Sequence, residues 1–321
     1  MINIVPQSPA VLNFWDPNSY NKNMKHVFII NSISGKGSGL KIQDMIRKVA
    51  EEKQLDHVIA LTERPGHAIQ LAQQYSRPDN IIYCVGGDGT LWEVLNGIAP
   101  GTTLGIIPAG SGNDFYRLIG PDISDPEKIL RDTIDAPVKQ IDIGETQNMR
   151  FLNTTSFGID ADVNEYASHL IRKTVITKGP AYIISIIKNL LTLKPKHIRI
   201  NIDGQEHEGN YYIVACMNGR YYGNGVLPAP ESDLQDGYFD LCLLNEIPKR
   251  KTLPFLARYM KGKHLGYPGF EIIHAKDIII DSEQDLSCQS DGENYYSKHI
   301  ELHMKKAWLN LKVPGYLNII R

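Results

Sequence analysis

The feature that most constrains the fold is an alternation of short apolar runs with amphipathic stretches in the first half of the chain. Four apolar runs of four to six residues read as buried strands: 26–31, 58–61, 81–85 and 104–107. A stretch with helical periodicity follows each of them, near 42–49, 66–76, 91–98 and 112–119. Strands that alternate with helices predict a parallel sheet that is covered on both faces.

Glycine-rich turns follow three of these apolar runs, at 31–39 (NSISGKGSG), 86–90 (GGDGT) and 108–115 (PAGSGNDF). The carboxyl ends of parallel strands meet at one edge of the sheet, where open α/β proteins bind ligands, so we expect the three turns to converge. Glycines allow backbone N–H groups to approach an anion, and a following helix N-terminus adds positive potential. The 86–90 turn therefore predicts a phosphate cradle, although a plain glycine turn that caps a helix has the same local pattern.

Two acidic residues lie within these turns. Asp88 would be poorly placed against a polyphosphate unless a cation stood between them, so it predicts Mg²⁺, and Thr90 offers a hydroxyl to a phosphate oxygen. Asp114 in the third turn is suited either to positioning the metal or the acceptor, or to capping a helix.

After about residue 150 the pattern changes to that of antiparallel strands. Apolar and polar residues alternate over 198–202, Asp203-Gly204 supplies a two-residue hairpin turn, and the apolar run 211–217 follows. This half predicts an antiparallel β-sandwich. It also contains an apolar helix candidate at 181–193, which is too short to span a membrane and is interpreted either as a buried or interdomain helix or as a surface that touches lipid.

The composition excludes several classes of protein. Lys and Arg number 34 and Asp and Glu 36 among 321 residues, and this net charge of -2 gives no general reason to expect a nucleic-acid partner. The four cysteines (Cys84, Cys216, Cys242 and Cys288) form no C-x-x-C pair, so neither a zinc site nor a disulfide framework is expected. No apolar run reaches the roughly 18 residues of a membrane span, and the N-terminus lacks a signal core. We expect a cytoplasmic protein without a transmembrane segment.

Several motifs in chain order resemble one family. GGDGT, NSISG in place of N-P-x-S-G, GSGNDF in place of G-T-x-N-D-F, and Asp291-Gly292-Glu293 are together similar to the bacterial diacylglycerol kinase and related lipid kinase family. Similar spacing extends over nearly the whole chain from Met24. The resemblance implies an N-terminal parallel-sheet nucleotide-binding domain, as in NAD kinase and phosphofructokinase, and a C-terminal antiparallel β-sandwich. The segments would be an extension at 1–23, an ATP-binding α/β domain at 24–148 and a β-rich domain at 149–321 whose C-terminal segment returns to the first domain.

The resemblance also implies a set of site residues and cofactors. The cofactors are ATP and Mg²⁺. The catalytic carboxylates would be Glu293, Asp291, Asp88 and Asp114, with Glu293 or Asp291 as the general base. The ATP contacts would be Asn31, Ser34, Gly35, Thr62, Gly86, Gly87, Asp88, Gly89, Thr90, Leu91, Trp92 and Ser111. A structural Mg²⁺ in the second domain would be held by Asp233, Asp236 and Tyr238, although Asp236-Gly237 reads equally well as a hairpin turn.

Four positions depart from the family pattern. Ser32 stands in place of Pro, Ser111 in place of Thr, Asn224 within a glycine cluster, and Trp92 in place of Asn. Ser111 keeps the hydroxyl, whereas Trp92 is bulky and lies beside the cradle, so it is expected to reshape the nucleotide or acceptor pocket.

The expected activity is ATP-dependent phosphorylation of a lipid hydroxyl, with diacylglycerol as the default acceptor and phosphatidic acid as the product. The alternatives are a kinase of a soluble acceptor, similar to NAD kinase, and a non-catalytic lipid-binding regulatory protein. We expect the lipid substrate at a membrane surface, no nucleic acid, and a homodimer as one open state. Basic clusters at 172–173, 194–199 and 249–251 predict peripheral association with anionic membranes, unless they form an ordinary solvated surface.

Overall fold

The computed structural model describes residues 24–32, 39–120, 124–158, 194–315 and 317. Four features expected from the sequence lie outside these residues: the extension 1–23, the ATP contacts Ser34 and Gly35, the apolar segment 181–193 and the basic pair 172–173.

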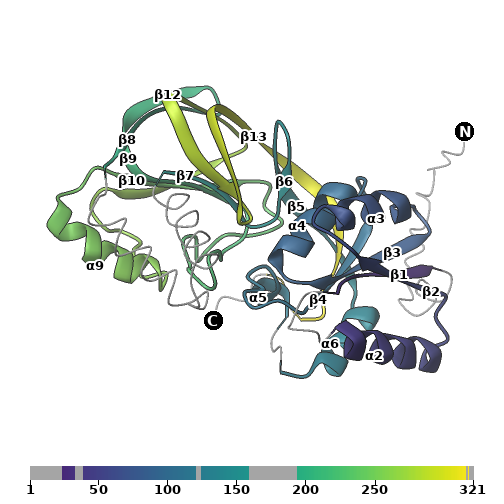
Figure 1. Cartoon of the computed structure of the whole chain (residues 1–321). Coiled ribbons are helices and arrows are strands. Elements are labelled where there is room, and N and C mark those ends of the chain that lie inside the picture. The colour runs from purple at the N-terminus through teal and green to yellow at the C-terminus, as the bar shows by residue number, and fades with distance from the viewer. Residues whose placement is uncertain (1–23, 33–38, 121–123, 159–193, 316, 318–321) are drawn as a thin grey trace, which may run out of the picture.

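The first half of the chain forms a parallel sheet with helices on both faces. Its strands are β1 (Lys25–Asn31), β2 (His57–Thr62), β3 (Asn80–Gly86) and β4 (Thr103–Pro108). Its helices are α2 (Gly39–Glu52), α3 (His67–Tyr75), α4 (Asp88–Gly97), α5 (Tyr116–Ile119) and α6 (Pro126–Asp135). The strand order is β4-β3-β1-β2, and all neighbours are parallel. Helices α3 and α4 cover one face, and α2 and α6 cover the other (Figure 1).

Strand β1 shows why this sheet requires two helical layers. Its side chains point alternately to the two faces. Val27 and Ile29 belong to the buried cluster on the side of α3 and α4. Phe28 and Ile30 pack in a second buried cluster with α2 and α6. The continuous apolar run is therefore that of a strand buried on both faces, and the predicted parallel α/β half is confirmed.

The second half is mainly antiparallel β. Its strands are β5 (Val138–Thr146), β6 (Arg150–Phe151), β7 (Thr154–Gly158), β8 (Lys196–Ile202), β9 (Gln205–Met217), β10 (Phe239–Asn245), β11 (Phe270–Ala275), β12 (Asp277–Ser290) and β13 (Glu293–Lys312). One helix among the described residues of this half, α9 (Lys249–Tyr259), packs beside the strands (Figure 1).

The long strands β9 and β12 each take part in both layers of this half. The first part of β9 pairs with β8, and its second part pairs with β7 and β10. Strand β12 likewise pairs with β8 near Ile280 and with β7 near Gln289, with a register irregularity between Asp281 and Leu286. A core of apolar side chains fills the space between the layers. The predicted antiparallel sandwich is confirmed.

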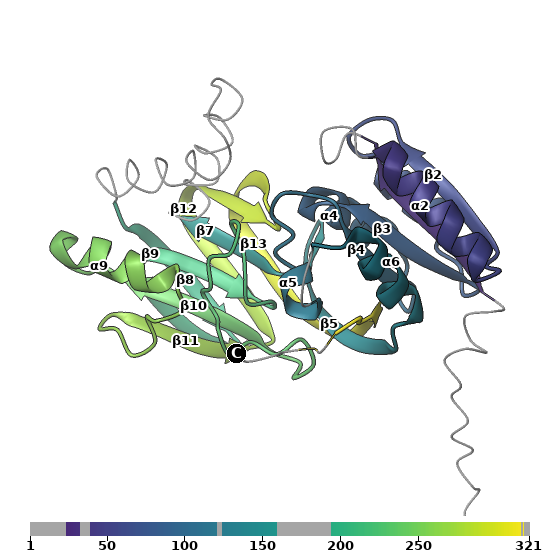
Figure 2. The same cartoon turned by 90° about the horizontal axis from the view of Figure 1, so that it is seen from below.

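Strand β13 joins the two halves. It begins at the turn after Ser290, pairs with β12 and β5, and ends parallel to β4, where Asn310 is opposite Thr103. Figure 2 shows the two halves side by side, with β13 and β5 between them. A shared strand fixes the turn at residues 290–293 relative to the first sheet. The domain boundaries drawn from the sequence stay a prediction. Among the described residues, no helix has both the length and the apolar character needed to cross a bilayer.

Candidate active site

Two of the glycine-rich turns touch through their backbones. The N–H of Ala109, which follows β4, donates a 2.7 Å hydrogen bond to the carbonyl of Gly86 at the end of β3. A Cβ on Gly110 would lie only 2.4 Å from Cα of Gly87. No side chain fits between the two turns, so glycine is required at this contact. The predicted convergence of the turns after β3 and β4 is therefore present.

The end of β1 joins this group through Thr90. The Asn31 side-chain amide donates a 3.0 Å hydrogen bond to the Thr90 hydroxyl. A Cβ on Gly86 would lie 2.5 Å from the same hydroxyl, so Thr90 occupies the space that glycine leaves open. Asn31 is also opposite Thr62 in the pairing of β1 with β2. Residues from three strand ends are thus gathered at one edge of the sheet.

The carboxylate of Asp88 holds the third turn in place. Asp88 is the first residue of α4, and its Oδ1 accepts a 2.8 Å hydrogen bond from the N–H of Asp114. A Cβ on Gly112 would lie 2.7 Å from Asp88 Oδ2. Burial raises the pKa of Asp88, whereas backbone N–H groups of the third turn oppose the rise.

Asp114 connects the two halves of the protein. Its Oδ2 accepts a 2.7 Å hydrogen bond from the N–H of Asn224, which belongs to the second half. Its Oδ1 lies 3.4 Å from Nε of Arg117. Burial, with a further contribution from the charge of Asp88, raises the pKa of Asp114 to about 6. Two partly desolvated carboxylates side by side form a site that favours a cation.

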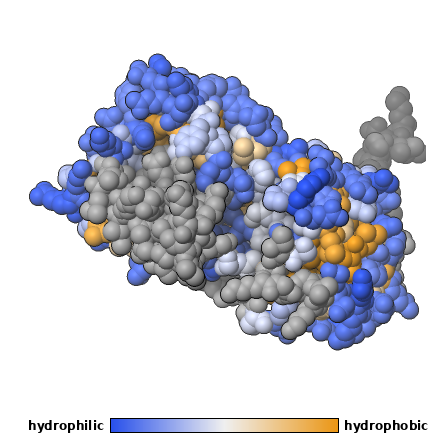
Figure 3. Space-filling model, viewed as in Figure 1, coloured by the Kyte–Doolittle hydropathy of each residue, from blue (hydrophilic) through white to orange (hydrophobic). Residues whose placement is uncertain are grey.

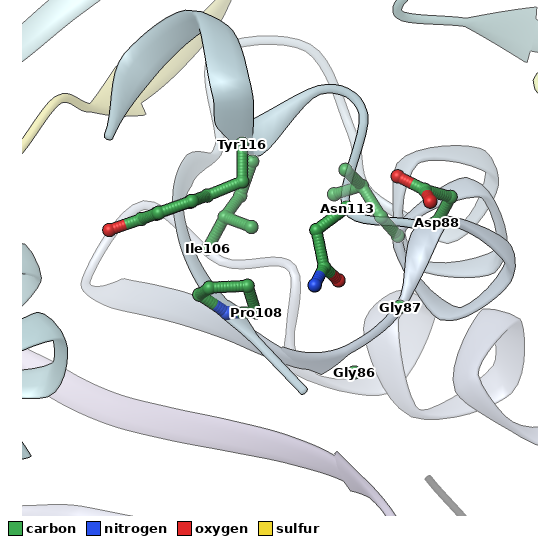
Figure 4. A pocket seen from close by; sticks show the side chains of 8 residues that line it. Gly86, Gly87, Asp88, Ile106, Pro108, Asn113 and Tyr116 are labelled. Carbon is green, nitrogen blue, oxygen red and sulfur yellow. The ribbon is translucent and has the colours of Figure 1, made fainter. Parts of the chain in front are cut away.

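A small pocket opens between the turns after β3 and β4 (Figure 4). It is lined by Gly86, Gly87, Asp88, Leu91, Ile106, Pro108, Asn113 and Tyr116. Asn113 adopts a left-handed conformation, with φ of 52°, and its side chain bonds back to both backbone groups of Gly110. The pocket is small, and apolar side chains together with backbone groups of the two glycine-rich turns line it.

The second half contributes a hairpin turn to this edge. Asp291 and Gly292 form the two-residue turn between β12 and β13, with φ of 45° and 95°, as expected for the Asp-Gly turn of a β-hairpin. Both Asp291 carboxylate oxygens accept backbone N–H bonds, from Leu152 at 2.6 Å, Asn153 at 2.9 Å and Thr154 at 3.0 Å. Burial nevertheless raises the pKa of Asp291 to about 6. Its bonds anchor the turn to the chain before β7.

Glu293 follows this turn and faces the GGDGT sequence. A Cβ on Gly89 would lie 3.9 Å from Glu293 Oε1. Burial raises the pKa of Glu293, and the nearby negative charge of Glu93 raises it further. On the face drawn in Figure 3 the surface is mostly hydrophilic and is hollowed where the two halves meet. A carboxylate from the second half thus stands opposite the first turn of α4.

Four further residues were predicted as nucleotide contacts: Thr62, Leu91, Ser111 and Trp92. Thr62 and Leu91 are buried at the sheet edge, and Ser111 is exposed in the third turn. Trp92 is partly buried, and its indole N–H has no hydrogen-bond partner among the described residues. The indole N–H is therefore a donor for which the described part of the chain supplies no acceptor.

The predicted structural metal residues lie apart from this edge. Oδ1 of Asp233 accepts the N–H of Gln235, and Oδ1 of Asp236 accepts the N–H of Tyr238. The described residues contain no cluster of three His, Cys, Asp or Glu side chains that could hold a metal. The metal at Asp233, Asp236 and Tyr238 therefore stays a prediction that rests on the family resemblance.

The residues at the edge do fit a Mg²⁺ ion that arrives with a nucleotide. Mg²⁺ in kinases is held by one or two carboxylates together with phosphate oxygens and water, so a closed protein cage is not needed. Asp88 and Asp114 are adjacent, partly desolvated and raised in pKa. A cation would relieve that desolvation and repulsion.

Sequence reasoning did not assign roles to Arg117 and Glu93. Besides its contact with Asp114, Arg117 NH2 lies 3.4 Å from the Gly112 carbonyl. Glu93 accepts the N–H groups of Gly66 and Ala68 and so caps the start of α3. The spacing of three residues between Asp114 and Arg117 on a predicted helix was the available signal for the first contact.

Comparison with protein families gives two matches that together span most of the chain. Residues 25–146 match the diacylglycerol kinase catalytic domain. Residues 153–320 match the YegS C-terminal NAD kinase beta sandwich-like domain.

Individual proteins agree with these matches. A diacylglycerol kinase of Staphylococcus haemolyticus is 31% identical over 72% of this chain and 71% of its own length. One from Bacillus subtilis is 28% identical over 84% of this chain and 90% of its own. The crystal structure of a diacylglycerol kinase from Bacillus anthracis superposes with a TM-score of 0.69 at 21% identity, covering 90% of this chain and 96% of that one, which supports the fold. The chain belongs to the diacylglycerol kinase family of lipid kinases, phosphotransferases that act on an alcohol group.

Proposed function

We propose that the protein transfers the γ-phosphoryl group of ATP to the hydroxyl of a membrane lipid, with diacylglycerol as the acceptor and phosphatidic acid as the product. The observation that carries this proposal is the approach of Glu293 Oε1 to 3.9 Å from the Cβ position of Gly89. It supports an arrangement in which an acceptor hydroxyl lies between a carboxylate of the second half and phosphates bound by the first.

The proposed nucleotide site uses the glycine-rich edge. Backbone N–H groups at Gly87, Gly89 and the start of α4 would face the phosphates, since the N-terminus of a helix favours anions. The small pocket between Gly86 and Tyr116 would border the bound nucleotide. Asn31 orients the Thr90 hydroxyl for a phosphate oxygen through their 3.0 Å hydrogen bond.

In the proposed reaction Glu293 accepts the proton of the lipid hydroxyl. The hydroxyl oxygen forms a bond to the γ-phosphorus, the bond from that phosphorus to the β–γ bridging oxygen breaks, and ADP leaves. Asp88 and Asp114 would hold Mg²⁺, which when bound neutralises charge on the phosphates. The raised pKa of Glu293 makes it a better proton acceptor once it is ionised.

Asp291 would act by positioning rather than by proton transfer. Its carboxylate is occupied by three backbone N–H groups, so it has less capacity for a proton from the acceptor. It fixes the hairpin turn from which Glu293 projects. This assignment supports Glu293 over Asp291 as the base.

The proposal is tested by an assay with labelled ATP and a panel of lipids in mixed micelles. The panel includes diacylglycerol, monoacylglycerol, a sphingoid base and a glycerophospholipid, with NAD as the soluble acceptor. We expect label in phosphatidic acid and none in NADP. Label in NADP alone would favour the soluble-acceptor alternative, and Mg·ATP binding without any labelled product would favour the non-catalytic one.

A further inference from the structure

The segment from residue 247 to 270 has an unusual charge balance for this chain. It contains six basic residues and no acidic one, whereas the whole chain carries a net charge of -2. The basic residues are Lys249, Arg250, Lys251, Arg258, Lys261 and Lys263, and all of them are exposed. Helix α9 and the turns after it therefore form a surface of concentrated positive charge, which we call the α9 surface.

Large apolar side chains are exposed on the same surface. Leu253 is 61% exposed, Leu265 45% and Met260 36%. They are half of the six large hydrophobic side chains that are exposed among the described residues, and the other three lie elsewhere, on separate elements. Exposed apolar groups that gather on one surface mark an interaction site more reliably than single ones do.

The underside of the α9 surface is firmly packed. Phe255, Tyr259, His264 and Phe270 are buried in one aromatic cluster, in which the His264 and Phe270 ring centroids are 4.5 Å apart. The ring of His264 contacts the Pro228 carbonyl at 2.8 Å through Nε2. The Tyr267 hydroxyl donates to the Lys251 carbonyl and so ties the turn to the helix. The exposed side chains thus project from a fixed platform.

The α9 surface lies at the end of the molecule farthest from α2 and α6 (Figures 1 and 2). Its basic and apolar side chains alternate along one helix and the turns that follow. An apolar patch alone would suit another protein, but six exposed cations around three exposed apolar side chains, with the acidic residues Glu246 and Glu271 only at the two ends of the segment, match an anionic lipid surface. Lys and Arg reach the phosphates of head groups while the apolar side chains enter the interfacial layer.

We propose that the α9 surface docks the protein onto anionic membranes, with Leu253, Met260 and Leu265 entering the head-group region. This inference rests on the proposed function, because a lipid acceptor is presented in a bilayer. It assigns the contact to one surface, whereas the sequence predicts only dispersed basic clusters. Docking at this end would hold the protein at the membrane independently of any contact that the candidate active site makes with lipid.

The first test compares charge removal at two places. The variant Lys249→Gln, Arg250→Gln, Lys251→Gln removes three charges from the α9 surface. A control, Arg47→Gln, Arg77→Gln, Lys298→Gln, removes three exposed charges elsewhere.

Binding is measured by flotation with phosphatidylcholine vesicles, with and without phosphatidylglycerol. Each basic residue at such a surface raises the partition coefficient by roughly fivefold, so the α9 variant is expected to bind anionic vesicles about 100-fold more weakly. Binding equal to that of the parent, or an equal loss in the control, would overturn the inference.

The second test reports insertion directly. The four native cysteines are buried, so a cysteine introduced by Leu253→Cys can be labelled selectively with an environment-sensitive dye. Leu61→Cys on β2 is the matched control, because Leu61 is also an exposed leucine. A blue shift on addition of anionic vesicles is expected at position 253 and not at 61. An unshifted spectrum at 253 would refute insertion, and tighter binding to a DNA duplex than to vesicles would assign the surface to nucleic acid instead.

Activity separates this inference from the proposed function. A short-chain diacylglycerol below its micelle concentration needs no docking, so the α9 variant should phosphorylate it at the parental rate and lose rate only on vesicle-borne substrate. If the parent phosphorylates no lipid but its anionic-vesicle binding depends on the α9 surface, the proposed function fails and the docking inference stands. If the α9 variant is impaired equally on both substrates, the docking inference fails.

Discussion

The backbone N–H of Asp114 donates a 2.8 Å hydrogen bond to Oδ1 of Asp88, so the carboxylate proposed to face Mg²⁺ also holds the third glycine-rich turn. Asp88→Asn keeps an acceptor oxygen for this bond and removes the charge. We expect turnover to fall by roughly 100-fold or more, with weaker Mg·ATP binding and an unchanged fold. Initial rates and titration calorimetry measure the two effects, and Asp132→Asn on α6 is the control. Nearly normal turnover would remove Asp88 from the site.

The contact between Gly87 and Gly110 gives a prediction about stability. In Gly110→Ala the new methyl would lie 2.4 Å from Cα and 3.2 Å from N of Gly87, which are both backbone atoms. We expect the turns to separate, with a loss of about 1–3 kcal/mol in the free energy of unfolding and a large loss of activity. Gly89→Ala is the matched control, since the one described side chain that its methyl would meet is that of Glu293, at 3.9 Å. That variant should be as stable as the parent in guanidinium unfolding. Equal stability of the two variants would contradict the close packing.

The parallel half was predictable because its signals are local. Four apolar runs, the helical periodicity between them and glycines after the strands each follow from residues close in sequence. The Asp-Gly pair before Glu293 is also a local signal, since its two positive φ values are those of a two-residue hairpin turn. Local chemistry thus specified which residues lie at the sheet edge.

Other contacts were not predictable from one sequence, because they join distant residues. The Asp291 carboxylate was expected among the catalytic residues, and nothing in the sequence indicated that it accepts hydrogen bonds from the backbone amides of 152–154, well over a hundred positions earlier. Every residue except proline has a backbone N–H group, so the residue type does not show which of these groups binds a distant carboxylate. The bond from Asn224 to Asp114 and the bending of β9 between two layers depend on the assembled fold in the same way.

Asp114 should make stability depend on pH. Its pKa is about 6 in the folded protein, above the value of 3.8 for an unperturbed Asp, so the folded state binds the proton more tightly. The energetic cost of its charge is fully present above pH 6 and disappears as the pH falls toward 4. Asp114→Asn removes this cost, so we expect the variant to be more stable at pH 7.5 by up to about 3 kcal/mol and equal near pH 4. Guanidinium unfolding at both values measures this, and the same difference at both would be incompatible with it.

Arg117 should set the pH at which Asp114 ionises in the enzyme. Its guanidinium lies 3.4 Å from Asp114 Oδ1 and lowers the pKa of that carboxyl. Arg117→Gln removes the positive charge, so the pKa of Asp114 should rise and the acid limb of the pH–rate profile should move to higher pH. The variant should lose more activity at pH 6 than at pH 8, whereas Arg117→Lys should retain most of the parental profile. Parallel profiles for Arg117→Gln and the parent would show that Arg117 does not act through Asp114.

Glu293 and Asp291 flank one glycine but should differ in what their loss does. Glu293→Gln removes the proposed proton acceptor and leaves the hairpin intact, so kcat should fall by about 100-fold to 10,000-fold while Mg·ATP affinity and thermal stability stay near the parental values. Asp291→Asn leaves one acceptor oxygen for the three backbone N–H groups of residues 152–154. An N–H group that loses its partner in a buried place costs about 1–3 kcal/mol, which should lower the melting temperature and loosen the turn that carries Glu293.

The two variants are therefore distinguished by rate and stability measured on the same preparations. A rate loss without a stability loss in Glu293→Gln, and both losses together in Asp291→Asn, are the expected pattern. Because the pKa of Glu293 is raised by loss of hydration, Glu293 and Asp114 should both contribute to the acid limb of the parental pH–rate profile, and the limb that remains in Glu293→Gln should depend on Asp114 alone. Rates within a few-fold of the parent for Glu293→Gln would exclude it as the base. In that case the reversed pattern, with catalysis lost and stability kept in Asp291→Asn, would transfer the role to Asp291.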